Sequence, residues 1–207
     1  MYKNIYNQNS AHNIYTIMNE LVEKFVSACH CPWNLDVAKE AIFAGVDVNA
    51  ENSKGLTALH VASGNCVIDP LRRDPILELL LLHPQIDVNT PSPGYCNWCR
   101  GKNSTPLHCA CAYGHIDIMT RLLNDPRQSS INTVNSYGTP IMVAVDNWRP
   151  EAVNKMLRVE GVDIKTRNSW GRSLTQQARR TAHAMNVSED MIDEDKSWKL
   201  LQEAGAD

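Results

Sequence analysis

The residues best suited to metal chemistry are two cysteines, Cys96 and Cys99, in the sequence Cys-Asn-Trp-Cys. This spacing lets two thiolates reach the same zinc ion, but a tetrahedral site needs two further ligands. The nearest histidine, His108, belongs to the predicted start of a helix, so we do not count it as a zinc ligand. We therefore weigh a zinc pair against free thiols in a loop, and we favour the thiols. A redox role is less favoured than zinc binding, because the pair does not stand between a strand and a helix, the context of redox-active Cys-x-x-Cys motifs.

A second group of cysteines consists of Cys29 and Cys31, which flank His30, together with Cys66. We expect these residues in loops between helices, out of reach of Cys96 and Cys99, and interpret them as packing residues. The chain holds 7 cysteines, an odd number, without the disulfide density of a small secreted domain. This composition indicates a reducing compartment.

Motifs for catalysis are missing from the sequence, which has no glycine-rich phosphate loop, no His-Glu-x-x-His and no Gly-x-Ser-x-Gly. The acidic stretch 189–195 is typical of a solvated loop. A local group of basic residues precedes it, namely Arg167, Arg172, Arg179 and Arg180. We interpret this group as a solvated helix face, with docking of an acidic peptide as the alternative. We expect no enzyme activity and no cofactor.

Composition excludes several classes of partner for this chain of 207 residues. With 20 basic and 23 acidic residues the formal net charge is −3, so nothing draws the whole chain to nucleic acid. No apolar run approaches the roughly 18 residues of a membrane span, so we expect no membrane insertion. The start, MYKNIYNQNS, lacks a secretory signal pattern, which favours a cytoplasmic protein. We also expect a monomer.

The chain is organised around a repeated pattern that is clearest at residues 104–123. Thr105 and Pro106 suit the start of a helix, which small residues continue as far as Gly114. An amphipathic run follows, from Ile116 to Leu123. Thr139 and Ser173 occupy the position of Thr105 at successive spacings of 34 residues. Such a unit cannot bury its apolar face alone, so several copies should stack.

This periodicity predicts a single domain over residues 1–207, in which similar units follow one another. Its predicted parts are a frayed N-terminus at 1–13, an N-terminal capping unit at 14–50, a repeat at 51–89, an inserted loop at 90–103, repeats at 104–134 and 135–166, and a divergent C-terminal unit with an acidic insert at 167–207. The terminal units lack the full Thr-Pro-Leu-His start, as expected for caps that meet solvent.

With its Thr-Pro-Leu-His start and these in-phase copies, the chain resembles the ankyrin-repeat family. The resemblance implies an all-α repeat solenoid of antiparallel helix pairs, whose extended loops form a row of β-hairpin fingers. It also implies that His108 orders the finger backbone by hydrogen bonding. Ankyrin arrays usually bind proteins through the finger tips and the concave face of the first helices. Some are hydroxylated on a finger asparagine, and Asn89, eight residues after Leu81, has the matching spacing.

Candidate contact residues follow from this architecture. Some lie on the first helix of a pair between the histidine position and the turn, some at finger tips, and some in the insertion. Aromatic and arginine side chains supply most binding hot spots. The partner-binding candidates are Tyr95, Trp98, Arg100, Tyr113, Tyr137, Asp146, Asn147, Trp148, Trp170, Arg172 and Arg180, with further groove positions at Asn65, Cys109 and Gln177. The alternative for Trp148 and Trp170 is local packing between repeats.

The leading functional prediction is a non-enzymatic adaptor that binds another protein or peptide through its groove and fingers. One alternative is the substrate-targeting portion of a larger enzyme, because residue 207 falls where a further finger would begin. Another is an effector that an intracellular bacterium delivers to the host cytoplasm, because short, irregular arrays of this kind serve that role. The sequence does not identify the partner, since specificity lies in the surface residues that the repeat pattern leaves free.

Overall fold

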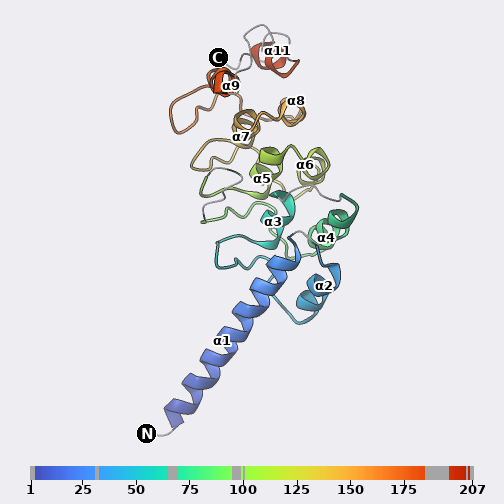
Figure 1. The fold of residues 1–207 in the computed structure, drawn as a ribbon, viewed down its shortest axis with the longest axis vertical. Coiled ribbons are helices and arrows are strands. Elements are labelled where there is room, and N and C mark those ends of the chain that lie inside the picture. The colour runs from blue at the N-terminus through green and yellow to red at the C-terminus, as the bar shows by residue number, and fades with distance from the viewer. Residues whose placement is uncertain are drawn as a thin grey trace. The chain divides into compact units, whose positions relative to one another are not determined.

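The computed structural model describes residues 3–30, 33–64, 70–94, 99, 101–184, 196–203 and 205. These residues form helices and turns (Figure 1). The helices are α1 (Lys3–Ala28), α2 (Leu35–Phe43), α3 (Ala58–Gly64), α4 (Pro70–Leu82), α5 (Pro106–Tyr113), α6 (Ile116–Leu123), α7 (Pro140–Asp146), α8 (Pro150–Leu157), α9 (Leu174–Ala184) and α11 (Lys196–Glu203). The chain divides into two compact units, residues 1–62 with 67–86, and residues 63–66 with 87–207.

The first unit is built around α2, which contacts both α1 and α4. Small residues on α2, Ala38 and Ala41, are almost fully buried and allow close helix approach. Phe25 at the end of α1 and the apolar turn of α4 are also buried. Helix α4 begins at Pro70, and Pro75 lies inside it.

Helix α1 begins at Lys3, within the segment 1–13 for which a frayed N-terminus stays a prediction. No proline or glycine interrupts the sequence between Lys3 and Ala28, so nothing breaks the helix there. From Ile14 onward, the apolar residues of this helix are buried only toward its end. Ile14 is 62 % exposed and Ile17 is 55 % exposed, whereas Phe25 is buried.

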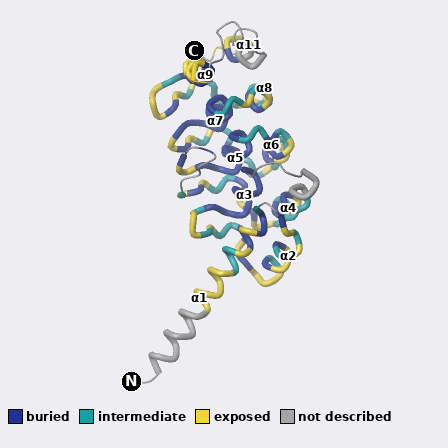
Figure 2. Tube along the Cα trace, viewed as in Figure 1, coloured by how far each residue is buried: buried dark blue, intermediate teal, exposed yellow. Residues whose placement is uncertain are grey.

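The second unit consists of helix pairs stacked in two rows (Figure 1). Within the pairs, α5 contacts α6, α7 contacts α8, and α9 contacts α11. Between the pairs, α7 contacts both α5 and α9, while α8 contacts both α6 and α11. Helices α5 and α7 are buried along most of their length (Figure 2). The stacked-helix architecture predicted from the repeat is therefore confirmed as an all-α repeat fold.

The fingers differ from the expected β-hairpins. Among the described residues they consist of turns and one isolated antiparallel bridge, between Ser92 and Ser104. Hydrogen bonds between successive fingers hold them instead: Ser136 N donates to Lys102 O at 2.9 Å, and Ser169 N donates to Tyr137 O at 3.2 Å. The short Asn-Ser-x-Gly turns leave too few extended residues on either side for a continuous ladder.

Asparagine side chains link the successive loops that lead from the second helix of each pair to the next finger. In the second unit, Asn89 Nδ2 donates to Arg127 O at 2.7 Å, and Asn132 Nδ2 donates to Gly161 O at 2.6 Å. In the first unit, Asn49 Nδ2 donates to Gln85 O at 2.7 Å. Each asparagine amide thereby donates a hydrogen bond to a backbone carbonyl of the following repeat and fixes the distance between the two loops.

Two further observations concern the described residues only. No helix among them is both long enough and apolar enough to cross a bilayer. They also contain no group of three or more His, Cys, Asp or Glu side chains placed to hold a metal ion.

Candidate partner-binding surface

The starting turns of α3 and α5 are each fixed by a threonine and a histidine. The first helices of the stacked pairs, α5, α7 and α9, are called inner helices below. Thr105 N donates to His108 Nδ1 at 3.1 Å, which leaves the proton on Nε2, and Nε2 lies 3.1 Å from Gly138 O in the next finger. His60 makes the corresponding contact in the first unit, with its Nδ1 2.8 Å from Thr57 Oγ1. The role that the resemblance implied for His108 is thus confirmed, and its side chain holds two successive units in register.

The finger before α9 is shaped by Asn168. This residue is buried, and its Oδ1 accepts hydrogen bonds from Trp170 N and Arg172 N, both at 3.0 Å. Gly171 completes the turn with φ of 72°, a conformation that a residue with a Cβ rarely adopts. Asn168 Nδ2 also donates to Gln177 Oε1 at 3.1 Å, which ties the finger to α9. The turn therefore presents Trp170 at its tip in a fixed orientation.

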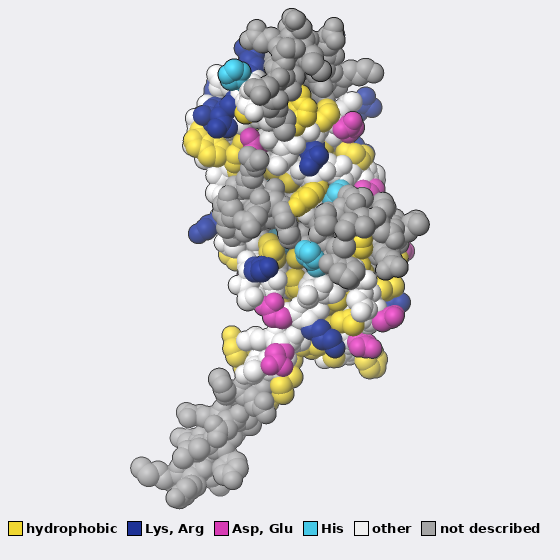
Figure 3. Space-filling view, in the orientation of Figure 1, with side chains coloured by type: hydrophobic (Ala, Val, Ile, Leu, Met, Phe, Trp, Pro, Cys, Tyr) yellow, Lys and Arg dark blue, Asp and Glu magenta, His cyan; other side chains and the backbone are white. Residues whose placement is uncertain are grey.

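The exposed ring of Trp170 is the centre of the candidate surface. It is 56 % exposed, although it packs edge-on against Tyr137, with centroids 4.8 Å apart and planes at 71°. The Arg172 guanidinium carbon lies 5.7 Å from the centroid of the Trp170 ring. Figure 3 shows basic side chains beside an exposed apolar one over this finger. A rigid, half-exposed indole with a cation beside it suits a contact hot spot.

Several predicted contact residues are buried, and for these the expectation of a free side chain was wrong. Tyr137 is 5 % exposed because the Trp170 ring covers it, and Cys109 is fully buried. Asp146 Oδ1 accepts a hydrogen bond from Gln177 Nε2 at 2.6 Å, so α7 and α9 bury both side chains between them. These residues support the surface from within.

Other predicted residues remain accessible. Arg180 on α9 is exposed, whereas Tyr113, Asn147 and Trp148 are half-buried. Tyr113 stacks on His115 with a centroid distance of 5.4 Å. Trp148 has φ of 52°, a left-handed conformation, at the position that Gly114 occupies in the preceding repeat. A tryptophan in that conformation is strained, and such strain is often retained at functional sites.

The predicted residues of the insertion lie mostly outside the described residues, namely Tyr95, Cys96, Trp98 and Arg100, as do Cys31, Asn65, Cys66 and the acidic stretch 189–195. Cys99 is described and is fully buried, with its sulfur 2.9 Å from that of Cys109 on α5. The contact anchors Cys99 against an inner helix. The zinc pair of Cys96 and Cys99 stays a prediction.

Asn89, the predicted hydroxylation site, is half-buried and engaged in the link between loops. Its Oδ1 accepts hydrogen bonds from Ser129 N at 2.8 Å and from Ser130 N at 3.0 Å. A modifying enzyme would need this turn opened to reach the side chain. Hydroxylation of Asn89 also stays a prediction.

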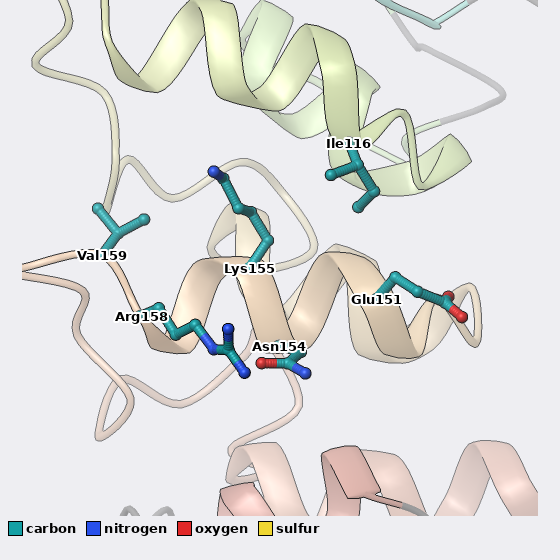
Figure 4. A pocket seen from close by; sticks show the side chains of 6 residues that line it. All are labelled: Ile116, Glu151, Asn154, Lys155, Arg158 and Val159. Carbon is teal, nitrogen blue, oxygen red and sulfur yellow. The ribbon is translucent and has the colours of Figure 1, made fainter.

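A separate surface pocket of about 330 Å³ lies on the outer helices. It is lined by Ile116 on α6 and by Glu151, Asn154, Lys155, Arg158 and Val159 on and after α8. In Figure 4 Lys155 extends toward α6, the Arg158 guanidinium points toward Asn154, and Glu151 points away. The pocket contains none of the predicted contact residues, and its two cations share the wall with an acid.

Two features of the site were not recognised from the sequence. One is the contact between Cys99 and Cys109, which no spacing indicates because it joins an insertion to a helix. The other is the structural role of the finger asparagines. Asn52, Asn135 and Asn168 each accept two backbone hydrogen bonds across the turn that follows. The recurring Asn-Ser-x-Gly sequence was the available signal for that role.

The stacked helix pairs, the Thr-x-x-His starts and the turn-built fingers together define a repeat protein with one variable position at each finger tip. Residues 72–168 match the family model of ankyrin repeats in three copies. This part of the chain therefore consists of ankyrin repeats, which are in general protein–protein interaction modules. No curated protein sequence matched the chain.

Proposed function

We propose that this protein is a non-enzymatic interaction module that binds a partner polypeptide through the fingers and inner-helix face of its second unit. The observation that carries this proposal is the half-exposed Trp170, which a turn and a neighbouring ring hold in place at a finger tip. Holding such a ring before binding reduces the entropy lost on association, so it favours affinity. The family is typically one of binding domains, which supports a role without catalysis.

Trp170 and further accessible residues of the second unit define the proposed contact. Arg172 and Arg180 lie on the finger and on α9, while Trp148 and Tyr113 lie at the ends of the two preceding inner helices. The buried Tyr137 and Asp146 would act only by keeping these residues in position. The surface thus combines an aromatic anchor with polar and cationic side chains, the composition expected at interface hot spots.

Selection from a random peptide library on the immobilised full chain tests the proposal. We expect recurrent peptides whose affinity, measured by calorimetry, falls at least about tenfold in Trp170→Ala, as for a hot-spot residue. Phe43→Ala is the matched control, because Phe43 is 96 % exposed on α2 and belongs to the first unit. Equal losses in both variants, or no selected peptide from a folded chain, would contradict the proposal.

A further inference from the structure

The segment around Trp170 has a charge opposite to that of the whole chain. Residues 164–184 contain no Asp or Glu, yet they include the cations Lys165, Arg167, Arg172, Arg179 and Arg180. The complete chain has a formal net charge of −3. Cations gathered on one surface of an acidic protein create a local positive potential, which selects and steers partners of the opposite sign.

The arginines around Trp170 are arranged as a connected group. Arg167 donates from Nη1 to Gly171 O at 3.0 Å and to Gln176 Oε1 at 3.4 Å, which places it against both the finger and α9. Arg180 follows Gln176 by four residues, so both face the same side of that helix. Arg172 lies beside the indole. We call Arg167, Trp170, Arg172, Gln176 and Arg180 the Trp170 surface.

Among the described residues, the carboxylates of Asp146 and Asp163 do not compensate the charge of this surface. In the part of the chain that the structure describes, no carboxylate pairs with Arg167, Arg172 or Arg180. Asp146 is buried and accepts hydrogen bonds from Gln177. The carboxylate of Asp163 accepts hydrogen bonds from Thr166 Oγ1 and Lys165 N, so it is committed to its own turn. The guanidinium groups of Arg172 and Arg180 can therefore take up carboxylates of a partner in bidentate geometry.

We propose that the partner segment bound at the Trp170 surface is an acidic peptide with an apolar residue between its carboxylates. The apolar side chain lies on the exposed face of the indole, and the flanking Asp or Glu side chains pair with Arg172 and Arg180. This inference rests on the proposed function and specifies the chemistry of the partner. A nucleic acid strand would also offer anions and stacking bases, but the acidic remainder of the chain repels a continuous line of phosphates.

Fluorescence anisotropy with three labelled probes tests this inference on the full chain. The probes are the peptides (Glu-Leu-Asp)4 and (Gln-Leu-Asn)4 and the oligonucleotide dT12. We expect the acidic peptide to bind at least about tenfold more tightly than its neutral counterpart, with a difference that shrinks as salt screens the charges. Arg172→Gln with Arg180→Gln should remove most of that difference.

Lys24→Gln with Lys39→Gln is the matched control, because it removes the same charge from exposed positions in the first unit. Equal binding of both peptides would refute the acidic partner and leave the proposed function standing. Tighter binding of dT12, lost in Trp170→Ala, would replace the peptide with a nucleic acid. Failure of both peptides and of the peptide library, with unfolding curves unchanged, would refute the proposed function itself.

Discussion

The sulfur atoms of Cys99 and Cys109 lie 2.9 Å apart, in a contact between the inserted loop and helix α5. Both side chains are fully buried, and the distance is longer than the roughly 2.05 Å of a disulfide bond. They are therefore adjacent thiols, separated by ten positions in the sequence.

Mild oxidation should join these two thiols. With diamide as the oxidant, we expect loss of two hydrogen atoms and a cross-linked peptide containing Cys99 and Cys109 in a non-reducing digest. Cys109→Ser should abolish the cross-link, whereas Cys111→Ser should leave it unchanged. Dominant pairing with Cys111 would show that the contact is wrong.

Metal analysis of the reduced protein tests the zinc prediction, which requires bound zinc that Cys99→Ser removes.

Truncation of Tyr137 should destabilise the protein more than truncation of Trp170. Replacing a buried aromatic residue with alanine costs about 3–5 kcal/mol, and Tyr137 is 5 % exposed. Trp170 is 56 % exposed, so Trp170→Ala should cost about 1 kcal/mol. Urea unfolding of both variants measures the difference. Equal losses would mean that the indole is part of the core, in which case its effect on binding would be indirect.

Gly114→Ala should destabilise the protein for two separable reasons. Gly114 has φ of 72°, where a Cβ costs about 1–2 kcal/mol. An added Cβ would also lie 3.1 Å from Arg149 Cδ, and Arg149 Nε donates to Ala112 O. Gly161→Ala is the matched control, with φ of 81° and no neighbour within 4 Å. We expect the larger loss at Gly114, and equal losses would show that Arg149 moves aside freely.

Part of the loss of folding stability in acid should come from protonation of the Asp125 carboxylate. Two hydrogen bonds from Arg127, at 2.8 and 2.7 Å, lower the pKa of this carboxyl below its ordinary 3.8. A lowered folded-state pKa stabilises the protein above pH 3.8, and that stabilisation disappears as pH falls through the folded-state value. Asp125→Asn should reduce stability at neutral pH by about 1 kcal/mol and flatten the acid dependence. An unchanged acid slope in this variant would contradict the assignment.

Folding stability should also fall at alkaline pH, because the buried Cys29 thiol loses its proton more easily in the unfolded chain. Burial raises the pKa of this thiol from 9.0 to about 12. The unfolded chain releases the proton first, so the stabilisation is complete below pH 9 and declines as pH rises toward 12. Burial also raises the pKa of Cys111, which adds to the decline. Cys29→Ala should shift the alkaline limb of a pH–stability curve, and iodoacetamide should modify native Cys29 slowly.

The sequence predicted the helix pairs well because their signals are local and repeated. Thr105, Pro106 and Gly114 each specify a backbone conformation within one turn, and the 34-residue spacing places the next copy. The errors fall where no such signal exists. The burial of Tyr137, for example, depends on Trp170 in the next finger, which no local pattern indicates.

The candidate surface was partly predictable for the same reason. An exposed aromatic residue beside arginines can be recognised from composition, which identified Trp170, Arg172 and Arg180. The actual exposure of each inner-helix residue depends on its partner across the stack, as Asp146 shows by pairing with Gln177 on the next inner helix. A contact between residues 31 positions apart leaves no pattern in either segment.

The link from Asn89 to Arg127 joins the loops that follow α4 and α6, and it does not pass through residues 90–103. A change in the length of this insertion therefore leaves the link in place, provided that Cys99 and Lys102 keep their contacts with Cys109 and Ser136. Where those contacts are kept, a longer loop costs little additional closure entropy. A new recognition loop could be grafted at this place, with the asparagine keeping the scaffold in step.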